Sequence, residues 1–301
     1  MDAPAGGEAQ VRSRAPEDGP SGDLWRNAGK WAVGLALFLS LLALQTSLTL
    51  FQLTAEGPAK QTLRRATAAL TEIDALLDRH ADEMQQSARA SGPDDRVRLP
   101  DFPIDVPLAP DRVLGASRTD LRNEILDRAA DTLYREGTGA FEADASRGAK
   151  VGRFTVGGLT DHGLGFLRQR NHTALFVVTI ALAVVSTLLA AALAWLCRGF
   201  GRLSSVGVVV LLAAIPVAVG GIGARFWMRI LAEGDTDYLA AEFLAIGRAL
   251  AWIPIRNGLA FAVLGAAFLL LGWGAAIWSD RRARRIGRPA VGRLPEREPS
   301  L

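Results

Sequence analysis

The chain has 301 residues, half of them apolar, and 34 basic residues against 31 acidic ones give a formal net charge of +3. The apolar residues lie in four uninterrupted blocks instead of recurring at the period of a soluble helix or strand, which excludes an ordinary soluble globular protein. The basic excess collects beside the ends of those blocks, so we expect no nucleic-acid binding.

The N-terminal part of the chain predicts a tail and a membrane anchor. Residues 1–24 are rich in Ala, Gly, Pro, Glu and Arg without apolar periodicity, which is typical of a disordered segment. Residues 31–55 carry no charge, and with Trp25 and Trp31 at the headgroup level they predict a first transmembrane helix over 25–55. Its apolar length exceeds that of a signal-peptide core, so we expect an uncleaved anchor.

The long segment 56–172 predicts a mainly helical extracytoplasmic domain. Gly57–Pro58 restarts a helix, in which apolar residues then recur at alternating steps of three and four until about residue 91. This seam should lie against a partner, either within the chain or in a second copy. The seam consists of Leu63, Ala66, Leu70, Ile73, Leu77, His80 and Met84, with Leu63, Leu70, Ile73, Leu77 and Met84 as the candidates for a partner or dimer contact.

Later parts of this domain carry weaker signals. Pro100, Pro103, Pro107 and Pro110 predict an extended stretch. Ser117 and Asp120 resemble a capping box that opens a helix with Leu121, Ile125, Ala129 and Leu133 on one face, and Gly137 ends it. The glycine-rich stretch 150–165 predicts at most one short hairpin or strand.

Three further apolar blocks predict transmembrane helices over 173–197, 203–224 and 257–279. Between the last two, residues 225–256 form an extracytoplasmic loop with an amphipathic helix, for which Asp235–Thr236 offers an N-cap. Leu239, Phe243, Ile246 and Leu250 would line one face of that helix. The fold class is therefore an all-α membrane protein with four transmembrane helices and a helical domain between the first two.

Small residues mark the faces on which the spans pack. The fourth span has Gly258, Gly265 and Gly272 at seven-residue intervals, and the second has Thr179, Ala183, Ser186 and Ala190 on one stripe. We expect these two faces to meet. Pro216 should kink or loosen the third span. Gln45, Thr49 and Gln52 share a face of the first span, from which they can hydrogen-bond to other helices.

Charge bias predicts the orientation. The short connection 197–202 and the tail 280–301 are rich in arginine, which favours the cytoplasm for both ends of the chain. We therefore expect a multi-pass protein of the plasma (inner) membrane with both termini cytoplasmic. The use of 31 Arg against 3 Lys is typical of a GC-rich bacterial genome.

No motif predicts catalysis, a metal or a cofactor. The three histidines His80, His162 and His172 lack the spacing of a metal site, and neither a GxSxG elbow nor a Walker loop is present. Cys197, the single cysteine, is expected at the end of a helix as a small apolar residue, with S-acylation as the alternative. We expect neither an enzyme nor a cofactor.

These features favour a non-enzymatic scaffold, sensor or partner subunit that binds the lipid bilayer and either a protein partner or a second copy. The architecture is similar to the sensor domains of bacterial receptors, which also hang helices between two spans, although the short tail implies that any output passes through another subunit. The alternative is a permease-type or mechanotransmission subunit, because the topology resembles that of cell-division ABC-type permease subunits. The six residues 197–202 are short for the coupling element that such subunits use.

Overall fold

The computed structural model describes residues 20–92, 94–137, 165–197, 201–234 and 238–286. Within these ranges the regular elements are helices, apart from one isolated antiparallel bridge between Val97 and Leu108. In chain order they are α1 (Pro20–Leu53), α2 (Glu56–Thr71), α3 (Ile73–Ala90), α4 (Pro110–Gly115), α5 (Arg118–Glu136), the 3-10 turn η2 (Gly165–Leu167), α8 (Gln169–Leu196), α9 (Gly201–Gly234), α10 (Tyr238–Leu250) and α11 (Trp252–Ile286).

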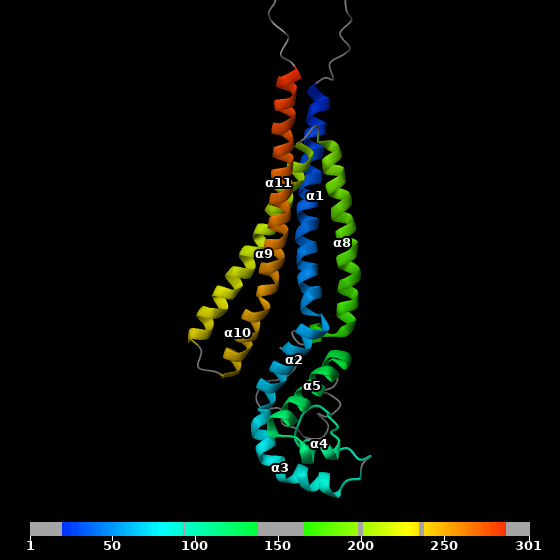
Figure 1. The fold of residues 1–301 in the computed structure, drawn as a ribbon, viewed down its shortest axis with the longest axis vertical. Coiled ribbons are helices and arrows are strands. Elements are labelled where there is room, and N and C mark those ends of the chain that lie inside the picture. Colours follow the sequence, from blue (N-terminus) through cyan, green and yellow to red (C-terminus); the bar gives the residue numbers. More distant parts are fainter. Residues whose placement is uncertain (1–19, 93, 138–164, 198–200, 235–237, 287–301) are drawn as a thin grey trace, which may run out of the picture.

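Four long helices form a bundle, and a smaller helical domain lies beyond one end of it. Figure 1 shows α1, α8, α9 and α11 side by side, with the start of α1 and the end of α11 at the same end. The domain of α2–α5 and the helix α10 lie toward the opposite end. Because α1 and α8 flank the domain in the chain, both of them lead directly into it.

The four long helices have the length and composition of membrane spans. The apolar stretches are Ala28–Leu53, Gln169–Leu196, Gly201–Glu233 and Ala240–Ser279, the last of which includes most of α10. The prediction of four helices that are long and apolar enough to span a membrane is confirmed. The ends differ from those predicted, because α9 continues as one helix through Pro216 and past residue 224 to Gly234. At 1.5 Å per residue its 34 residues extend about 51 Å, well beyond a hydrocarbon core of about 30 Å.

A core of apolar side chains joins three of these helices. Leu37, Leu41 and Leu44 of α1 are buried against Leu193 of α8 and Ala213 of α9. Most of the remaining surface of α8 is apolar and exposed, as is expected of a helix that faces lipid. The first span thus packs against both α8 and α9 through one apolar core.

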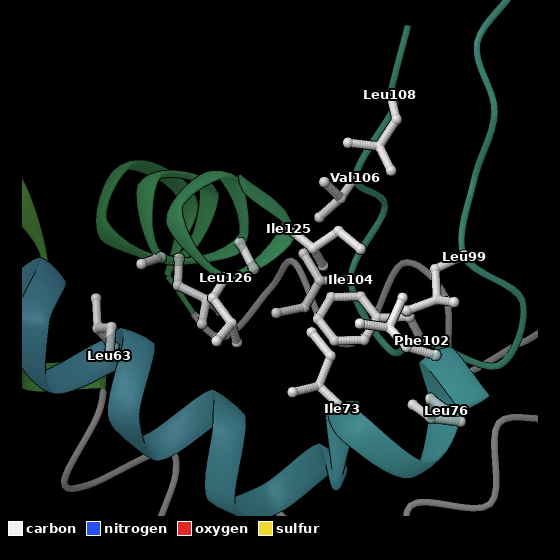
Figure 2. Close-up of a cluster of buried hydrophobic side chains, with 14 of the residues drawn as sticks. Leu63, Ile73, Leu76, Leu99, Phe102, Ile104, Val106, Leu108, Ile125 and Leu126 are labelled. Atoms are coloured by element: carbon white, nitrogen blue, oxygen red, sulfur yellow. The ribbon is translucent and has the colours of Figure 1, made fainter. Parts of the chain in front are cut away.

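The domain is built around one hydrophobic core to which α2, α3, α5 and the segment 94–109 all contribute. Figure 2 shows Leu63 of α2, Ile73 of α3 and Ile125 of α5 pointing toward one another. The prediction of one long outer helix through residue 91 is wrong. The helix breaks at Glu72, which has a left-handed backbone with φ 44°. A straight helix of about 30 residues would extend about 45 Å and carry its apolar stripe past so small a core, whereas the break lets both halves face it.

The proline-rich segment is free of helix up to Ala109, as predicted, but it is not extended throughout: it turns at residues 100–104, where Asp101 has φ 57°, and folds back on itself. Val97, Leu99, Phe102, Ile104, Val106 and Leu108 are buried. On either side of the turn these residues alternate with exposed ones, which is the pattern of a half-buried extended chain. Backbone hydrogen bonds of 2.9 and 2.8 Å join Val97 and Leu108 across the turn. Pro110 departs from the prediction because it is the first residue of α4, where its missing N–H costs no hydrogen bond.

The capping prediction for α5 is confirmed. The backbone N–H of Asp120 donates to Ser117 Oγ at 3.1 Å, and the helix ends at Gly137 with φ 76°. An alanine Cβ at Gly137 would also collide with the side chain of Arg168, so this position suits glycine for two reasons. Several predictions fall outside the described residues. They concern the hairpin within 150–164, the Asp235–Thr236 N-cap, and the terminal residues 1–19 and 287–301.

Candidate functional site

The candidate site is a charged groove on the domain, between α2, α5 and the extended segment before α4. It is an open groove of about 750 Å³. It is lined by basic and acidic side chains from different elements: Lys60 and Arg64 of α2, Asp105 of the segment before α4, and Asp127, Arg128 and Asp131 of α5. A surface of mixed charge suits a polar partner better than an apolar ligand.

Ion pairs hold the two walls of the groove together. Nζ of Lys60 contacts the carboxylate of Asp131 and lies 2.7 Å from Glu56 Oε1. Arg64 donates to Asp127 Oδ1 at 2.9 Å and to Asn123 Oδ1 at 2.6 Å. Because Lys60 and Arg64 of α2 each bind a side chain on α5, the separation of the walls depends on these contacts.

The pair at the base of the groove shifts the pKa values of its members. The hydrogen bond to Asp131 raises the pKa of Lys60 above its usual 10.5, and Glu56 adds to that effect. The same hydrogen bond lowers the pKa of Asp131 below its usual 3.8, with a further contribution from Arg135, whose Nη2 lies 2.9 Å away. Both groups therefore stay charged over the whole physiological range of pH.

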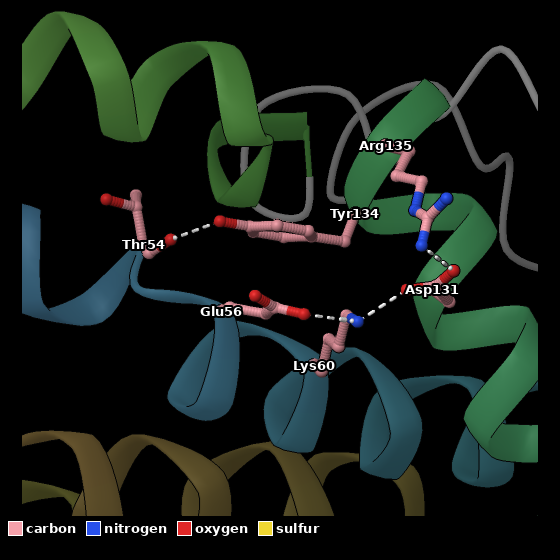
Figure 3. Close-up of polar contacts among 6 residues, drawn as sticks. All are labelled: Thr54, Glu56, Lys60, Asp131, Tyr134 and Arg135. Atoms are coloured by element: carbon pink, nitrogen blue, oxygen red, sulfur yellow. Dashed lines mark hydrogen bonds and ion pairs between the residues drawn. The ribbon is translucent and has the colours of Figure 1, made fainter.

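Tyr134 connects the groove to the end of the first span. Its ring is buried and lies 6.0 Å from Lys60 Nζ, and its hydroxyl donates to the carbonyl oxygen of Thr54 at 3.2 Å. Figure 3 shows this connection beside the Glu56–Lys60–Asp131 chain. Burial raises the pKa of the Tyr134 hydroxyl above 10.0, so it remains a donor at neutral pH.

The second span joins the same junction through His172. The His172 ring stacks on Phe51 of α1 with a centroid distance of 4.4 Å, and Nδ1 lies 3.2 Å from the carbonyl oxygen of Phe51. A carbonyl can only accept, so Nδ1 carries the proton in this contact. Thr54 Oγ1 lies 3.3 Å from the same nitrogen. The two spans that border the domain therefore meet at Thr54, which Tyr134 of the domain also binds.

Polar side chains on α1 also bind every other span within the bundle. Ser40 and Ser47 hydrogen-bond to Ser186 and Thr179 of α8, each at 2.8 Å. The predicted polar face of the first span is confirmed as a helix contact. Gln45 donates to the carbonyl oxygen of Ala213 in α9, and Thr49 Oγ1 and Gln52 Oε1 both accept from Asn257 of α11 at 3.1 Å.

The predicted meeting of the second and fourth spans is wrong. A Cβ on Gly258 would lie 2.7 Å from the backbone nitrogen of Ala218, and one on Gly265 would lie 2.7 Å from that of Leu211. Gly272 faces Ser204 in the same way, so the whole glycine stripe lies against α9. Ser186 faces α1, and Ala183 packs against the core shared with that helix. The two small-residue stripes therefore have different partners: the stripe of α11 lies against α9, and that of α8 lies against α1.

The predicted seam on the domain lies mostly inside it. Leu63, Ile73, Leu77 and Met84 belong to the core and are at most 3% exposed, while Leu70 is half-buried. The heptad pattern left two possible partners open, another part of this chain or a second copy. In the structure other parts of the same chain cover these residues. They offer little surface for a second copy.

The two histidines that the structure describes, His80 and His172, do not share a site. His80 is paired with Glu83 at 3.0 Å and with Asp101 at 3.3 Å. His172 belongs to the junction described above, and His162 lies outside the described residues. Among the residues that the structure describes, no group of three or more His, Cys, Asp or Glu side chains could hold a metal ion.

Sequence reasoning missed the residues that join the groove to the membrane. Lys60, Asp131 and Tyr134 carry no motif, and Tyr134 lies 80 residues from the carbonyl that it binds. One signal was available in the sequence: Tyr134 directly follows the apolar stripe of α5, and the hydroxyl of a buried tyrosine requires a hydrogen-bond partner. Asn257, at the start of the last apolar block, gave a similar signal.

No family model, no curated protein and no solved structure matches the chain.

Proposed function

We propose that this chain is a non-enzymatic protein of the plasma (inner) membrane whose domain of α2–α5 lies outside the cytoplasm and binds a protein partner. It would act as a scaffold, a sensor or a subunit of a larger complex. Both termini would be cytoplasmic. This role needs no chemical step. Binding at the groove is sufficient if it displaces α2 and the displacement reaches the membrane spans.

One observation carries the proposal: the charged groove and the end of the first span share a single chain of contacts. Lys60 and Asp131 lie at the groove, Tyr134 is one turn further along α5, and its hydroxyl ends on the carbonyl of Thr54, directly after α1. A partner that competes for the Lys60–Asp131 ion pair would alter the packing of α2 on α5. The same movement would reach α1, which binds every other span.

The charges of the groove indicate what kind of partner fits. Arg64, Asp105 and Arg128 line it together with the Lys60–Asp131 pair, and most of these side chains are partly exposed. A partner segment that carries both acidic and basic residues can replace the existing pairs without leaving a charge unpaired. We therefore expect a polar protein segment to bind in this groove.

The distribution of basic residues supports the proposed orientation. Arg202 at the start of α9 and Arg281 and Arg282 near the end of α11 lie at the end of the bundle that is remote from the domain. Arginines next to span ends favour the cytoplasmic side. A reporter enzyme that works only outside the cytoplasm, fused after residue 301, is expected to be inactive; activity there would contradict this orientation.

Site-specific photocrosslinking in native membranes tests the partner. A photoreactive residue replaces Gln61, which lines the groove, or Gln86, an exposed glutamine on α3 that does not line it. We expect a discrete adduct from position 61 and none from position 86. Mass spectrometry of the adduct then identifies the partner. If the partner is a second copy of this chain, the adduct has twice the mass of one chain.

Two outcomes would contradict the groove as the binding site. One is the absence of an adduct from position 61 in membranes where the tagged chain still copurifies with other proteins. The other is the same adducts from both positions. An ATPase that copurifies with the chain would instead favour the alternative of a permease-type subunit.

A further inference from the structure

Three arginines from two helices converge at the domain-side end of the bundle. Arg225 and Arg229 of α9 and Arg248 of α10 line an open pocket of about 760 Å³, together with Glu233, Ile222 and Phe226. This cluster is separate from the charged groove on α2 and α5. It also opposes the general charge bias, because it lies at the end of the bundle remote from the chain termini.

The pocket lies at the depth of lipid headgroups. Residues 203–224 of α9 carry no charge and extend about 33 Å, which matches the hydrocarbon core of a bilayer. Arg225 is the first charged residue after them. Trp227 and Trp252 are 63% and 53% exposed at the same level, where indole rings prefer to lie, and the guanidinium of Arg225 lies 5.9 Å from the Trp252 ring centroid.

Close packing of α10 on α9 keeps the arginines together. A Cβ on Gly247 would lie 2.6 Å from Sδ of Met228, so the two helices approach closely at this point. Met228 is the immediate neighbour of Arg229, and Gly247 is that of Arg248. The Met228 side chain packed on the backbone of Gly247 therefore holds the two arginines near each other.

The positive charge of the pocket is only partly balanced. Arg229 Nε lies 3.1 Å from Glu233 Oε1, and among the described residues that line the pocket Glu233 is the one acidic side chain, against three arginines. At the boundary of a low-dielectric medium, a guanidinium gains more from an anionic partner than it does in water. Phosphate suits several arginines at once, because its oxygens accept in the geometry in which guanidinium donates.

We infer that this pocket binds the phosphate of an anionic phospholipid in the leaflet on the domain side. Ile222 and Phe226 are 54% and 64% exposed on the same face of α9 as the arginines. Ile222 lies one turn nearer the membrane centre than Phe226. These two side chains provide an apolar surface for the acyl chains of a lipid. A free phosphate would leave this surface uncovered. The occupant is thus a lipid that is anchored at its headgroup.

Binding to the full-length protein in detergent, titrated with defined lipids, tests this inference. The probes are phosphatidylglycerol, phosphatidylcholine and inorganic phosphate, and native mass spectrometry counts the bound molecules. The test variant is R225Q/R229Q/R248Q. The control is R281Q/R282Q, which removes exposed arginines at the other end of the bundle, where Arg282 also lies against a tryptophan at 5.1 Å.

The wild type and the control are expected to prefer phosphatidylglycerol over phosphatidylcholine. The triple variant should bind phosphatidylglycerol about a hundredfold more weakly, about fivefold for each arginine. Equal binding by the triple variant would overturn the site, provided that circular dichroism shows unchanged helicity. Equal binding of the two lipids would overturn the requirement for an anion, and displacement of the lipid by inorganic phosphate would overturn a lipid as the occupant. If the triple variant loses helicity, the single variant R248Q decides: an unchanged affinity refutes the site, and a loss of about fivefold supports it.

Discussion

The packing of α11 on α9 depends on glycines that face backbone atoms. A Cβ on Gly265 would lie 2.7 Å from the nitrogen and 3.1 Å from the Cα of Leu211, and 3.0 Å from the carbonyl oxygen of Gly207. Ordinary contacts of this kind are 3.4–4 Å. The substitution G265A therefore forces the helices apart by about 0.7 Å at this point, because backbone atoms cannot rotate away.

The cost follows from the contacts that such a separation weakens. A gap of about 0.5–1 Å removes a quarter to a half of the dispersion energy of the atoms that face it, and overpacking of this size typically costs about 1–3 kcal/mol. Alanine also has a higher helix propensity than glycine, which opposes the loss by about 1 kcal/mol. The matched control is G274A on the same helix, where a Cβ would have no atom within 4 Å.

The two variants share the gain in propensity, so the difference between them isolates the clash. We expect G265A to be about 1–3 kcal/mol less stable than G274A. Reversible unfolding in mixed micelles with a rising fraction of SDS, followed by far-UV circular dichroism, measures this difference. If both variants unfold at the same SDS fraction, the close approach of α11 and α9 at Gly265 is refuted.

Two further predictions concern polar contacts. N257L removes both hydrogen bonds from α11 to α1, which should cost about 1 kcal/mol in the same unfolding assay; a variant as stable as the wild type would show that these bonds contribute nothing. The Lys60–Asp131 pair predicts a dependence on pH: since the pKa of Asp131 is lowered, its contribution to stability is present above about pH 4 and is lost as the pH falls through the folded-state pKa. Since the pKa of Lys60 is raised, its contribution is present below about pH 10.5 and is lost as the pH rises further. The variant D131N should flatten the acid side of the stability profile, and an unchanged acid side would contradict the assignment.

These contacts connect the domain to the helix bundle. Tyr134 and His172 bind the last residues of α1, and α1 in turn binds α8, α9 and α11 through its polar face. α10 also contacts α2, so the second half of the chain touches the domain directly. A displacement of α2 therefore has two routes into the bundle.

Local properties of the sequence predicted the number of spans and several helix ends. The absence of charge over more than twenty residues is sufficient to identify a spanning helix, and the Ser117–Asp120 cap and Gly137 act within one helical turn of the residues that they terminate. The apolar stripe through Leu63, Ile73 and Leu77 was equally visible. Each of these signals depends on neighbours along the chain.

The tertiary structure alone decided which surfaces meet. The glycine stripe of α11 and the small-residue stripe of α8 were each recognisable, but any small face is compatible with any other, and the actual partners are α9 and α1. The break at Glu72 turned a stripe that suited a second copy into part of the domain's own core. The bond from Tyr134 to Thr54 arises only once α5 has packed on α2. Contacts between distant segments depend on the relative placement of whole helices, which a periodic pattern within one helix does not specify.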